Sequence, residues 1–463
     1  MRPASGANQQ PPVSLIQKFV SGELQFGFWG IIARGIGWIN SFFIISALTV
    51  YQYGVVSLLL SAYAFLAEFM SWGGLAAGAE IFRLAGRGDE ARAKRLFLEY
   101  NGLRLATALV LWALFFFSAP TIDASVSGDF TGVIRIMSFM FLTGSFMPAA
   151  TTLIHLRLDF KSLASRRTIG KSFQLAMLAG FLVFSTVGLT EALLAIVIGN
   201  FLSAVILIPA AVRAWQPWRA IALERGPSIL WQVARAHGKW DSVKNIASQF
   251  VSQARPWLIN FFVSTEAVGI YGVATSLAEV VMQVVPRNTM NTLITKVFHD
   301  RERSQRVFTY AVKYSTLLGM AGVVGSLVAV PLVIHLILPQ YVSSLPFFYL
   351  LVFLVPVKSL QWMTDLFLLV LRQQKFAFFR MITRNTMVCA LLLVFLPLIG
   401  LWALPATEAL IRVSMTLVSY RHLVKLRPEF RLSRRLFFSF GEQDARIMGG
   451  MLIHAKTFMR KFG

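Results

Sequence analysis

Residues 33–57 read ARGIGWINSFFIISALTVYQYGVVS, and residues 254–276 read ARPWLINFFVSTEAVGIYGVATS. Both stretches contain Ala-Arg, then Ile-Asn, then a run with Phe-Phe, and finally Tyr-Gly-Val. This ordered series indicates an internal duplication in which Arg34 matches Arg255. Repeats with an even number of spans are related by an axis along the membrane normal, an arrangement found in transporters.

The chain around these motifs is strongly apolar. Of its 463 residues, 56% are hydrophobic and 14% are charged, whereas soluble domains carry about 25% charged residues. Apolar blocks of about twenty residues recur, and such a block is long enough to cross the roughly 30 Å hydrocarbon core of a bilayer. We therefore predict an all-α polytopic membrane protein with twelve spans, near 26–47, 54–82, 98–118, 132–153, 172–188, 191–212, 243–264, 269–294, 308–337, 346–371, 379–399 and 401–423.

The distribution of positive charge predicts the orientation of these spans. The net charge is +23, and all but nine of the 44 Lys and Arg residues fall in alternate segments beginning with the N-terminus. The intervening loops, such as TIDASVSGDF at residues 121–130, contain none. Because segments rich in Lys and Arg stay in the cytoplasm, we expect both termini to be cytoplasmic and the outer loops to be short. The basic charge then reflects membrane topology, with no nucleic-acid partner expected.

Five segments are predicted along the chain. A polar cytoplasmic segment, 1–25, lacks the apolar region of a cleaved signal peptide. Two six-helix bundles, 26–212 and 243–424, flank a cytoplasmic linker at 213–242. The tail, 425–463, mixes basic and apolar residues and is interpreted as an interfacial helix on anionic lipid, with a solvated basic tail as the alternative. The single cysteine, Cys389, excludes an intrachain disulfide.

Three local segments resemble a known family. They are YQYGVVSLLLSAYAFLAEFMSWGGLAAGAEIFRLA at 51–85, LRLDFKSLASRRTIGKSF at 156–173 and STEAVGIYGVATSLAEVV at 264–281. Each is similar, at its own place, to polysaccharide flippases of the multidrug/oligosaccharidyl-lipid/polysaccharide exporter superfamily. The resemblance, over roughly 25–425, implies export of O-antigen or exopolysaccharide units on a polyprenyl-diphosphate carrier in a bacterial inner membrane. It also implies two six-helix bundles in a V around a central cavity.

Nine cations fall within or close to the predicted spans, where an uncompensated charge costs about 2.5–3.5 kcal/mol. Arg34, Arg255 and Lys358 lie deepest, and Arg287 is a further candidate of less certain depth. Because an arginine fork binds two anionic oxygens at once, we predict that these four bind a diphosphate or acidic sugar. The alternative is that each pairs with an acid of a neighbouring helix. Cations nearer the span ends are expected to extend to the headgroups: Arg104, Arg135, Lys244 and Lys313.

The acidic residues within the spans fall into two groups, those with a basic residue one turn away on the same helix and those without one. Glu408 and Arg412 are four residues apart and are predicted to form an intrahelical pair. Glu68, Glu279 and Asp365 have no basic residue at that spacing. They are therefore candidates either for coupling transport to an ion gradient or for pairing with the cations of other helices.

Several other activities find no support in the sequence. It contains no P-loop and no histidine spacing typical of a metal site, so we expect no cofactor. A lipid-linked glycan flippase is the favoured function, with a glycan polymerase and glycosyltransferases as possible partners beside membrane lipids. A drug or small-molecule antiporter of the same superfamily or of the major-facilitator type is the alternative. A membrane enzyme is the third, least favoured hypothesis, because the outer loops are too short to hold an acceptor.

Overall fold

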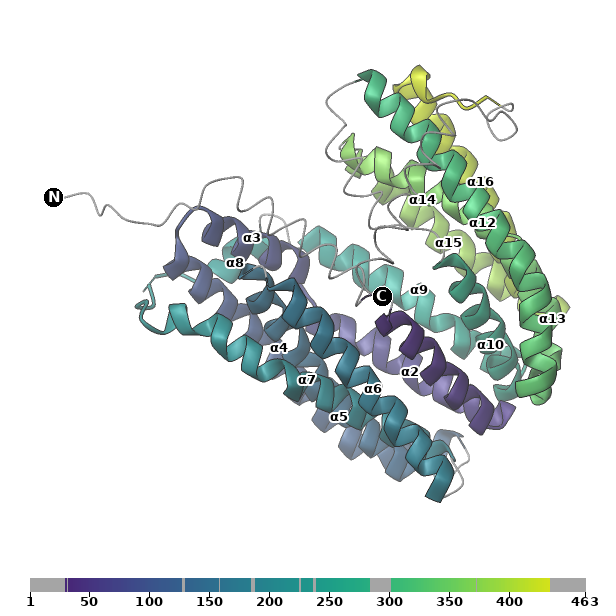
Figure 1. Cartoon of the computed structure of the whole chain (residues 1–463), viewed down its shortest axis with the longest axis horizontal. Coiled ribbons are helices and arrows are strands. Elements are labelled where there is room, and N and C mark those ends of the chain that lie inside the picture. Colours follow the sequence, from purple (N-terminus) through teal and green to yellow (C-terminus); the bar gives the residue numbers. More distant parts are fainter. Residues whose placement is uncertain are drawn as a thin grey trace, which may run out of the picture. The chain divides into compact units, whose positions relative to one another are not determined.

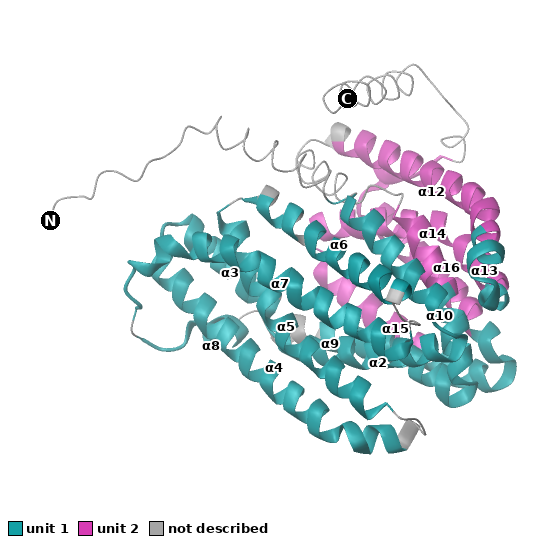
Figure 2. Ribbon diagram, turned by 60° about the horizontal axis from the view of Figure 1, so that its bottom comes forward, with its two compact units in different colours: residues 1–273, 333–344, 389–403 teal, residues 274–332, 345–388, 404–463 magenta. Residues whose placement is uncertain are grey.

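Every regular element that the computed structural model describes is a helix (Figure 1). The described residues are 30, 32–126, 130–157, 159–184, 188–224, 226–235, 239–283, 301–371 and 373–433. Most of the predicted tail, from residue 434 on, lies outside the described residues, as do Arg287 and the segment 1–25. The helices fall into two compact units, coloured separately in Figure 2, which we describe one at a time.

Unit 1 comprises residues 1–273, 333–344 and 389–403. Its helices are a first apolar helix at Ile32–Ala47, then α2 (Val50–Met70), α3 (Gly74–Gly86), α4 (Glu90–Val126), α5 (Thr131–Leu156), α6 (Phe160–Phe184), α7 (Leu189–Arg219), α8 (Ile229–Val233), α9 (Lys239–Phe262) and the start of α10 (Thr265–Met282). The short helix η2 (Pro339–Ser344) also belongs here. Leu48, Val56, Ile134, Met137 and Leu193 lie in its main apolar core.

Unit 2 comprises residues 274–332, 345–388 and 404–463. It contains most of α12 (Arg301–Ile337), then α13 (Leu345–Val352), α14 (Val355–Val370), the first part of α15 (Gln374–Ile399), most of α16 (Ala403–Leu426) and η4 (Pro428–Phe430). The turn η3 (Gly400–Trp402) connects the last two long helices. Phe308, Phe367 and Phe430 pack on one another in its core, with ring centroids 4.8–5.1 Å apart.

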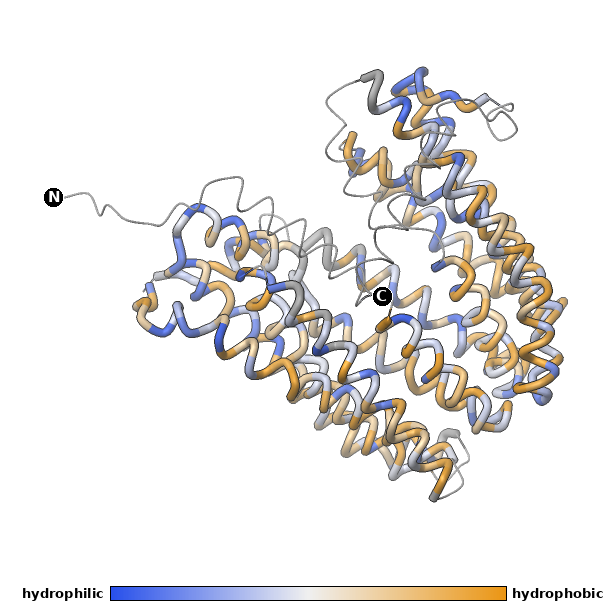
Figure 3. Tube along the Cα trace, in the orientation of Figure 1, coloured by the Kyte–Doolittle hydropathy of each residue, from blue (hydrophilic) through white to orange (hydrophobic). Residues whose placement is uncertain are grey.

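The helices have the composition of membrane spans. Among the described residues, six helices are long and apolar enough to cross a membrane, or seven if the bent pair Pro339–Val352 and Val355–Val370 is one span. Each of the twelve predicted spans overlaps a described helix. Figure 3 shows apolar residues along the helices of unit 1, with hydrophilic residues gathered around α3 and α8. The chain is therefore an all-helical membrane protein.

Two predicted spans are not continuous helices. The span at 54–82 is broken between α2 and α3, because Gly73 adopts a φ of 71°, a left-handed conformation that glycine accepts without steric cost. The span at 346–371 is broken between α13 and α14, which are bent by 44°. Pro356 stands near the N-terminus of α14, where its missing N–H leaves no helical bond unmade. Apolar content alone does not reveal such breaks.

The predicted linker, 213–242, is partly helical and is fastened to α4. Helix α7 continues to Arg219, and α8 follows within the linker. The carboxylate of Glu99 accepts hydrogen bonds from the Ser228 hydroxyl (2.8 Å) and the Leu230 amide (2.9 Å). The ammonium of Lys94 donates to the Ile221 carbonyl at 2.6 Å. The described part of the linker is thus held against unit 1.

Candidate functional site

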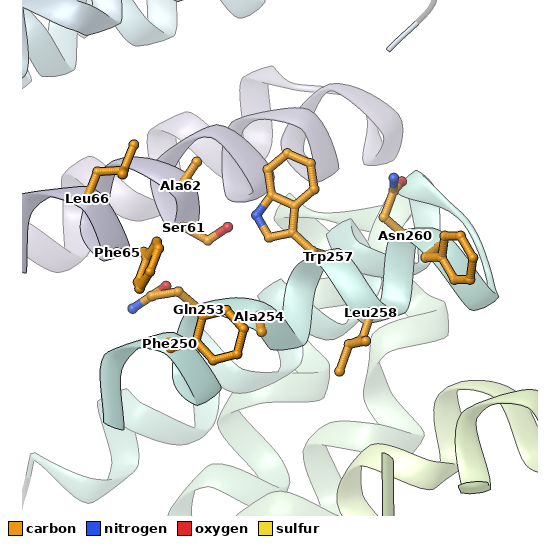
Figure 4. Close-up of a pocket in the computed structure, with 11 residues that line it drawn as sticks. Ser61, Ala62, Phe65, Leu66, Phe250, Gln253, Ala254, Trp257, Leu258 and Asn260 are labelled. Atoms are coloured by element: carbon orange, nitrogen blue, oxygen red, sulfur yellow. The ribbon is translucent and has the colours of Figure 1, made fainter. Parts of the chain in front are cut away.

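A groove in unit 1 lies between α2 and α9, with a volume of about 580 Å³ (Figure 4). Phe65 of α2 and Phe250 of α9 meet at one end, with ring centroids 5.5 Å apart. Trp257 projects from α9 toward the middle of the groove, and Asn260 lies toward the other end. Aromatic and aliphatic side chains form most of its surface, so the groove suits an apolar or amphiphilic ligand.

The few polar groups in this groove already have partners. The Ser61 hydroxyl donates to the Leu58 carbonyl at 2.7 Å. The side-chain oxygen of Asn260 accepts from the Thr265 hydroxyl at 2.6 Å. Because these polar atoms are hydrogen-bonded within the protein, a ligand does not have to supply hydrogen bonds to them. The groove therefore selects a ligand mainly by its shape and apolar surface.

The predicted anion-binding residues are placed differently from one another. Arg255 is partly buried on α9, but it is not among the residues that line the groove, and it interacts electrostatically with Cys389 of α15. Arg34 is exposed, and its Nε donates to the Gly30 carbonyl at 3.0 Å. Lys358 is partly buried in unit 2. Their convergence on one cavity stays a prediction.

A polar cluster that the sequence did not reveal lies on the other side of α2. Arg104 of α4 is hydrogen-bonded to the Tyr100 hydroxyl and interacts electrostatically with Glu68 and Tyr63 of α2. The Tyr63 hydroxyl donates to the Met140 carbonyl at 3.1 Å. The i,i+4 spacing of Tyr100 and Arg104 was the available signal. The involvement of α2 could not be inferred, because it depends on helix packing.

This cluster changes the interpretation of Arg104, which was predicted to extend to the headgroups. Pro148 in α5 has no N–H to donate to the carbonyl four residues earlier, which belongs to Gly144. A guanidinium nitrogen of Arg104 donates to that carbonyl at 3.3 Å. The prediction for Arg104 was wrong, because the freed Gly144 carbonyl and the Tyr100 hydroxyl hold the guanidinium among the helices.

Lys313 also differs from its prediction. Its side chain on α12 is 1% exposed, whereas a side chain that reaches the headgroups would be open to them. The helix is 37 residues long, and its packing within unit 2 encloses this position. Arg135 is exposed, with its guanidinium 5.3 Å from the Phe116 ring centroid, whereas the side chain of Lys244 lies outside the described residues.

The three acidic candidates for ion coupling have different surroundings. Asp365 of α14 forms an ion pair with Arg380 of α15, and Arg380 also donates to the Ser419 hydroxyl of α16. Glu68 faces Arg104, as described above. Glu279 is exposed on α10. Two of the three thus interact with cations of other helices, in accordance with one of the two alternatives left open by the sequence.

The intrahelical pair predicted in α16 is confirmed. Glu408 and Arg412 form an ion pair, and Arg412 also donates to the Gln361 side chain of α14 at 3.0 Å. The carboxylate side chain of Glu408 is 11% exposed. The pair therefore joins two helices of unit 2.

Glycines bring α2 and α10 into close contact within unit 1. A Cβ added to Gly54 would lie 2.1 Å from the Thr265 carbonyl oxygen, and one added to Gly269 would lie 2.2 Å from the Val50 carbonyl oxygen. A Cβ on Gly272 would lie 3.2 Å from the Tyr53 ring. The first two distances leave no room for a side chain, and the third would require the Tyr53 ring to shift. We call this contact of Val50, Tyr53, Gly54, Thr265, Gly269 and Gly272 the glycine contact.

The glycine contact joins the two Tyr-Gly-Val motifs of the internal repeat. It lies at the helix ends that the charge pattern predicts to be extracytoplasmic. Tyr341 of η2 adds to it, because its hydroxyl donates to the Leu48 carbonyl at 3.2 Å and its ring contacts Tyr53 edge-on. Segments from both halves of the sequence therefore close on each other at this end of unit 1.

Comparison with known proteins identifies a family. A family profile described as "Polysaccharide biosynthesis protein" matches residues 47–346. No curated protein matches the chain. The profile covers the predicted linker and parts of both predicted bundles.

Solved structures of low sequence identity share the fold. Lipid II flippase MurJ, in an inward closed conformation, has a TM-score of 0.70 at 11% identity, covering 95% of this chain and 99% of that one. A multidrug resistance MATE family transporter of the MOP superfamily, inward-facing, has a TM-score of 0.69 at 12% identity, covering 85% and 95%. A MOP superfamily transporter from Pyrococcus furiosus has a TM-score of 0.59 at 11% identity, covering 88% and 96%.

Proposed function

Because this chain belongs to the polysaccharide biosynthesis protein family and has the fold of the MOP superfamily transporters, we propose that it is a flippase for lipid-linked glycans. Its substrate would be an oligosaccharide unit on a polyprenyl diphosphate, carried across the bacterial cytoplasmic membrane for O-antigen or exopolysaccharide synthesis. The family match over 47–346 carries this proposal. Glycosyltransferases would supply the substrate, and a glycan polymerase would consume the product.

The proposed mechanism is alternating access between two six-helix bundles, with twelve spans, both termini in the cytoplasm and a V-shaped central cavity. The glycine contact supports this mechanism, because matching motifs of both repeats meet at the predicted outer end. Contacts made by backbone and small side chains can separate without leaving charged groups unpaired. Such a contact is suited to open and close repeatedly.

Binding of the anionic diphosphate is assigned to Arg34, Arg255, Lys358 and Arg287. The chemistry of arginine supports this assignment, because a guanidinium can bind two phosphate oxygens at once. Arg255 also stands on α9, the helix that forms one wall of the apolar groove, although its side chain is not part of the lining. Glu68, Glu279 and Asp365 remain the candidates for ion coupling, and Glu279 is favoured among them because Glu68 and Asp365 interact with arginines.

A drug antiporter is the second candidate, because a multidrug transporter is among the fold relatives. Export of a cationic drug requires an acid facing the drug. Of the three candidate acids, Glu68 and Asp365 interact with arginines, so only the exposed Glu279 is readily available to a cationic ligand. This observation favours the flippase.

The proposal is tested with the purified chain in vesicles that contain a fluorescent polyprenyl-diphosphate oligosaccharide. We expect the protein to expose the inner pool to a membrane-impermeant quencher. Arg255→Ala and Arg34→Ala should slow this at least tenfold with normal insertion, and lysine should restore it only in part. Arg421→Ala changes an exposed arginine at the end of α16 and is the matched control.

Three outcomes would contradict the proposal or parts of it. Unchanged flipping by both alanine variants removes these arginines from the mechanism. Absence of flipping by the wild-type chain, together with gradient-driven export of a cationic dye, supports the antiporter. Reduced amounts of both variants in the membrane would indicate a structural role.

A further inference from the structure

A second, larger groove runs along the surface of unit 1 between α5 and α7, apart from the groove of α2 and α9. Its volume is about 890 Å³. Phe146 of α5 and Phe201 of α7 are more than half exposed along it. Alanines on both helices, such as Ala150 and Ala211, leave space between these aromatic side chains. The groove can therefore accept flexible hydrocarbon chains.

The charge in the groove is confined to one of its ends. It follows α7 from Val197 to Arg219, a rise of about 33 Å at 1.5 Å per residue. Of its lining residues, Arg219 alone is charged, and it stands at the end predicted to be cytoplasmic. Trp215 lies one turn before it, where indole rings are common at the boundary between hydrocarbon and headgroups.

Further cations surround the same end of α7. The Lys94 ammonium is 5.7 Å from the Trp215 ring centroid, and the Arg157 Nε donates to the Ala214 carbonyl at 3.3 Å. Arg213 is exposed on α7 but is not part of the groove lining. The nearby acid Glu99 is already bonded to Arg95, Ser228 and Leu230. Positive charge thus predominates where the groove meets the predicted membrane surface.

From this arrangement we infer that the groove of α5 and α7 binds an anionic phospholipid of the cytoplasmic leaflet. The acyl chains lie between Phe146, Phe201 and the alanines, and Arg219 binds the phosphate. Basic pockets between helices on the cytoplasmic side select anionic headgroups, whereas the apolar surface alone accepts any lipid.

The test uses the full-length chain in vesicles of phosphatidylglycerol and phosphatidylcholine, with bromine on the chains of one lipid at a time. Bromine quenches nearby tryptophan fluorescence, and Trp215→Phe identifies the contribution of that residue. We expect Trp215 to be quenched more by brominated phosphatidylglycerol. Arg219→Gln should reduce this preference about fivefold, as one cation near a membrane surface contributes about 1 kcal/mol.

Two further variants test whether the lipid preference depends on the groove and on Arg219 in particular. Arg213→Gln removes an exposed charge from the same helix but not from the groove, and it should leave the preference unchanged. Ala150→Phe fills the groove and should lower the quenching of Trp215 by either lipid, with the melting temperature measured to verify folding. A polyprenyl phosphate should not displace phosphatidylglycerol at equal concentration.

Each opposite result would overturn the inference. Equal quenching by the two lipids in the wild-type chain means that the groove holds unselected lipid. Equal losses in Arg213→Gln and Arg219→Gln mean that diffuse surface charge is responsible. Displacement by the polyprenyl phosphate assigns the groove to the substrate carrier. These outcomes leave the flippase assay unaffected, so the two proposals can fail separately.

Discussion

Single residues in this protein act through backbone groups of other helices. Arg104 bonds a carbonyl that Pro148 leaves without its helical donor. Gly54 and Gly269 allow α2 and α10 to approach so closely that a Cβ would overlap a carbonyl oxygen. In both cases the role of a residue depends on a backbone carbonyl that is distant in the sequence.

Gly269→Ala should weaken the glycine contact. The added methyl would stand 2.2 Å from the Val50 carbonyl oxygen, and overpacking of this kind costs about 1–3 kcal/mol. We expect a lower melting temperature and faster labelling of Ser57→Cys by an impermeant maleimide, in a Cys389→Ser background. Gly180→Ala, which meets nothing within 4 Å, is the control and should have neither effect. Equal labelling of both variants would refute a role in closure.

Glu68→Gln should affect stability more than coupling. The substitution removes a carboxylate that interacts with Arg104, while Arg104 keeps its hydrogen bonds to Tyr100 and Gly144, so we expect a loss of about 1 kcal/mol. We expect a lower melting temperature, with the dependence of flipping on an ion gradient retained. Loss of gradient dependence at an unchanged melting temperature would instead identify Glu68 as the coupling group.

Helices in unit 2 are joined by an ion pair and by a charged hydrogen bond that cross from one element to another. Asp365 and Arg380 connect α14 with α15, and Arg412 connects α16 with Gln361 of α14. Because each charge depends on its partner, removal of one member should be more harmful than removal of both.

Arg412→Ala should strongly destabilise unit 2. The variant leaves the Glu408 carboxylate without its cation at a position where it is 11% exposed, and breaking a buried pair costs about 3–5 kcal/mol. We expect reduced membrane abundance and a lower melting temperature. The double variant Glu408→Gln with Arg412→Met should recover most of the loss. A double variant as unstable as the single one would show that the pair itself is not what stabilises the helices.

The topology of the whole molecule is tested with reporter fusions. Because Lys and Arg are concentrated in alternate loops, we expect both termini and the linker 213–242 to be cytoplasmic. A reporter that is active only outside the cytoplasm should be silent after residue 430 and active near residue 127. Activity after residue 430 would contradict an even number of spans.

At the scale of the whole molecule, the amino-acid sequence by itself determined the helical membrane class, the location of the apolar helices and the family. The class and the helix positions follow from local composition, because a bilayer requires every backbone polar group to be bonded within its own helix. The family follows from the resemblance of the segments 51–85, 156–173 and 264–281. The Glu408–Arg412 pair was also predictable, since its members are neighbours on one helix.

The tertiary structure alone decided which helices break and which charges meet. Apolar content did not reveal the interruptions at Gly73 and between α13 and α14, because a break depends on one backbone conformation. The partners of Arg104 and Asp365 lie on other helices, and distance along the chain says nothing of such contacts. The two grooves of unit 1 likewise arise from the packing of helix faces, which hydrophobic periodicity cannot specify because lipid-facing and buried residues are equally apolar.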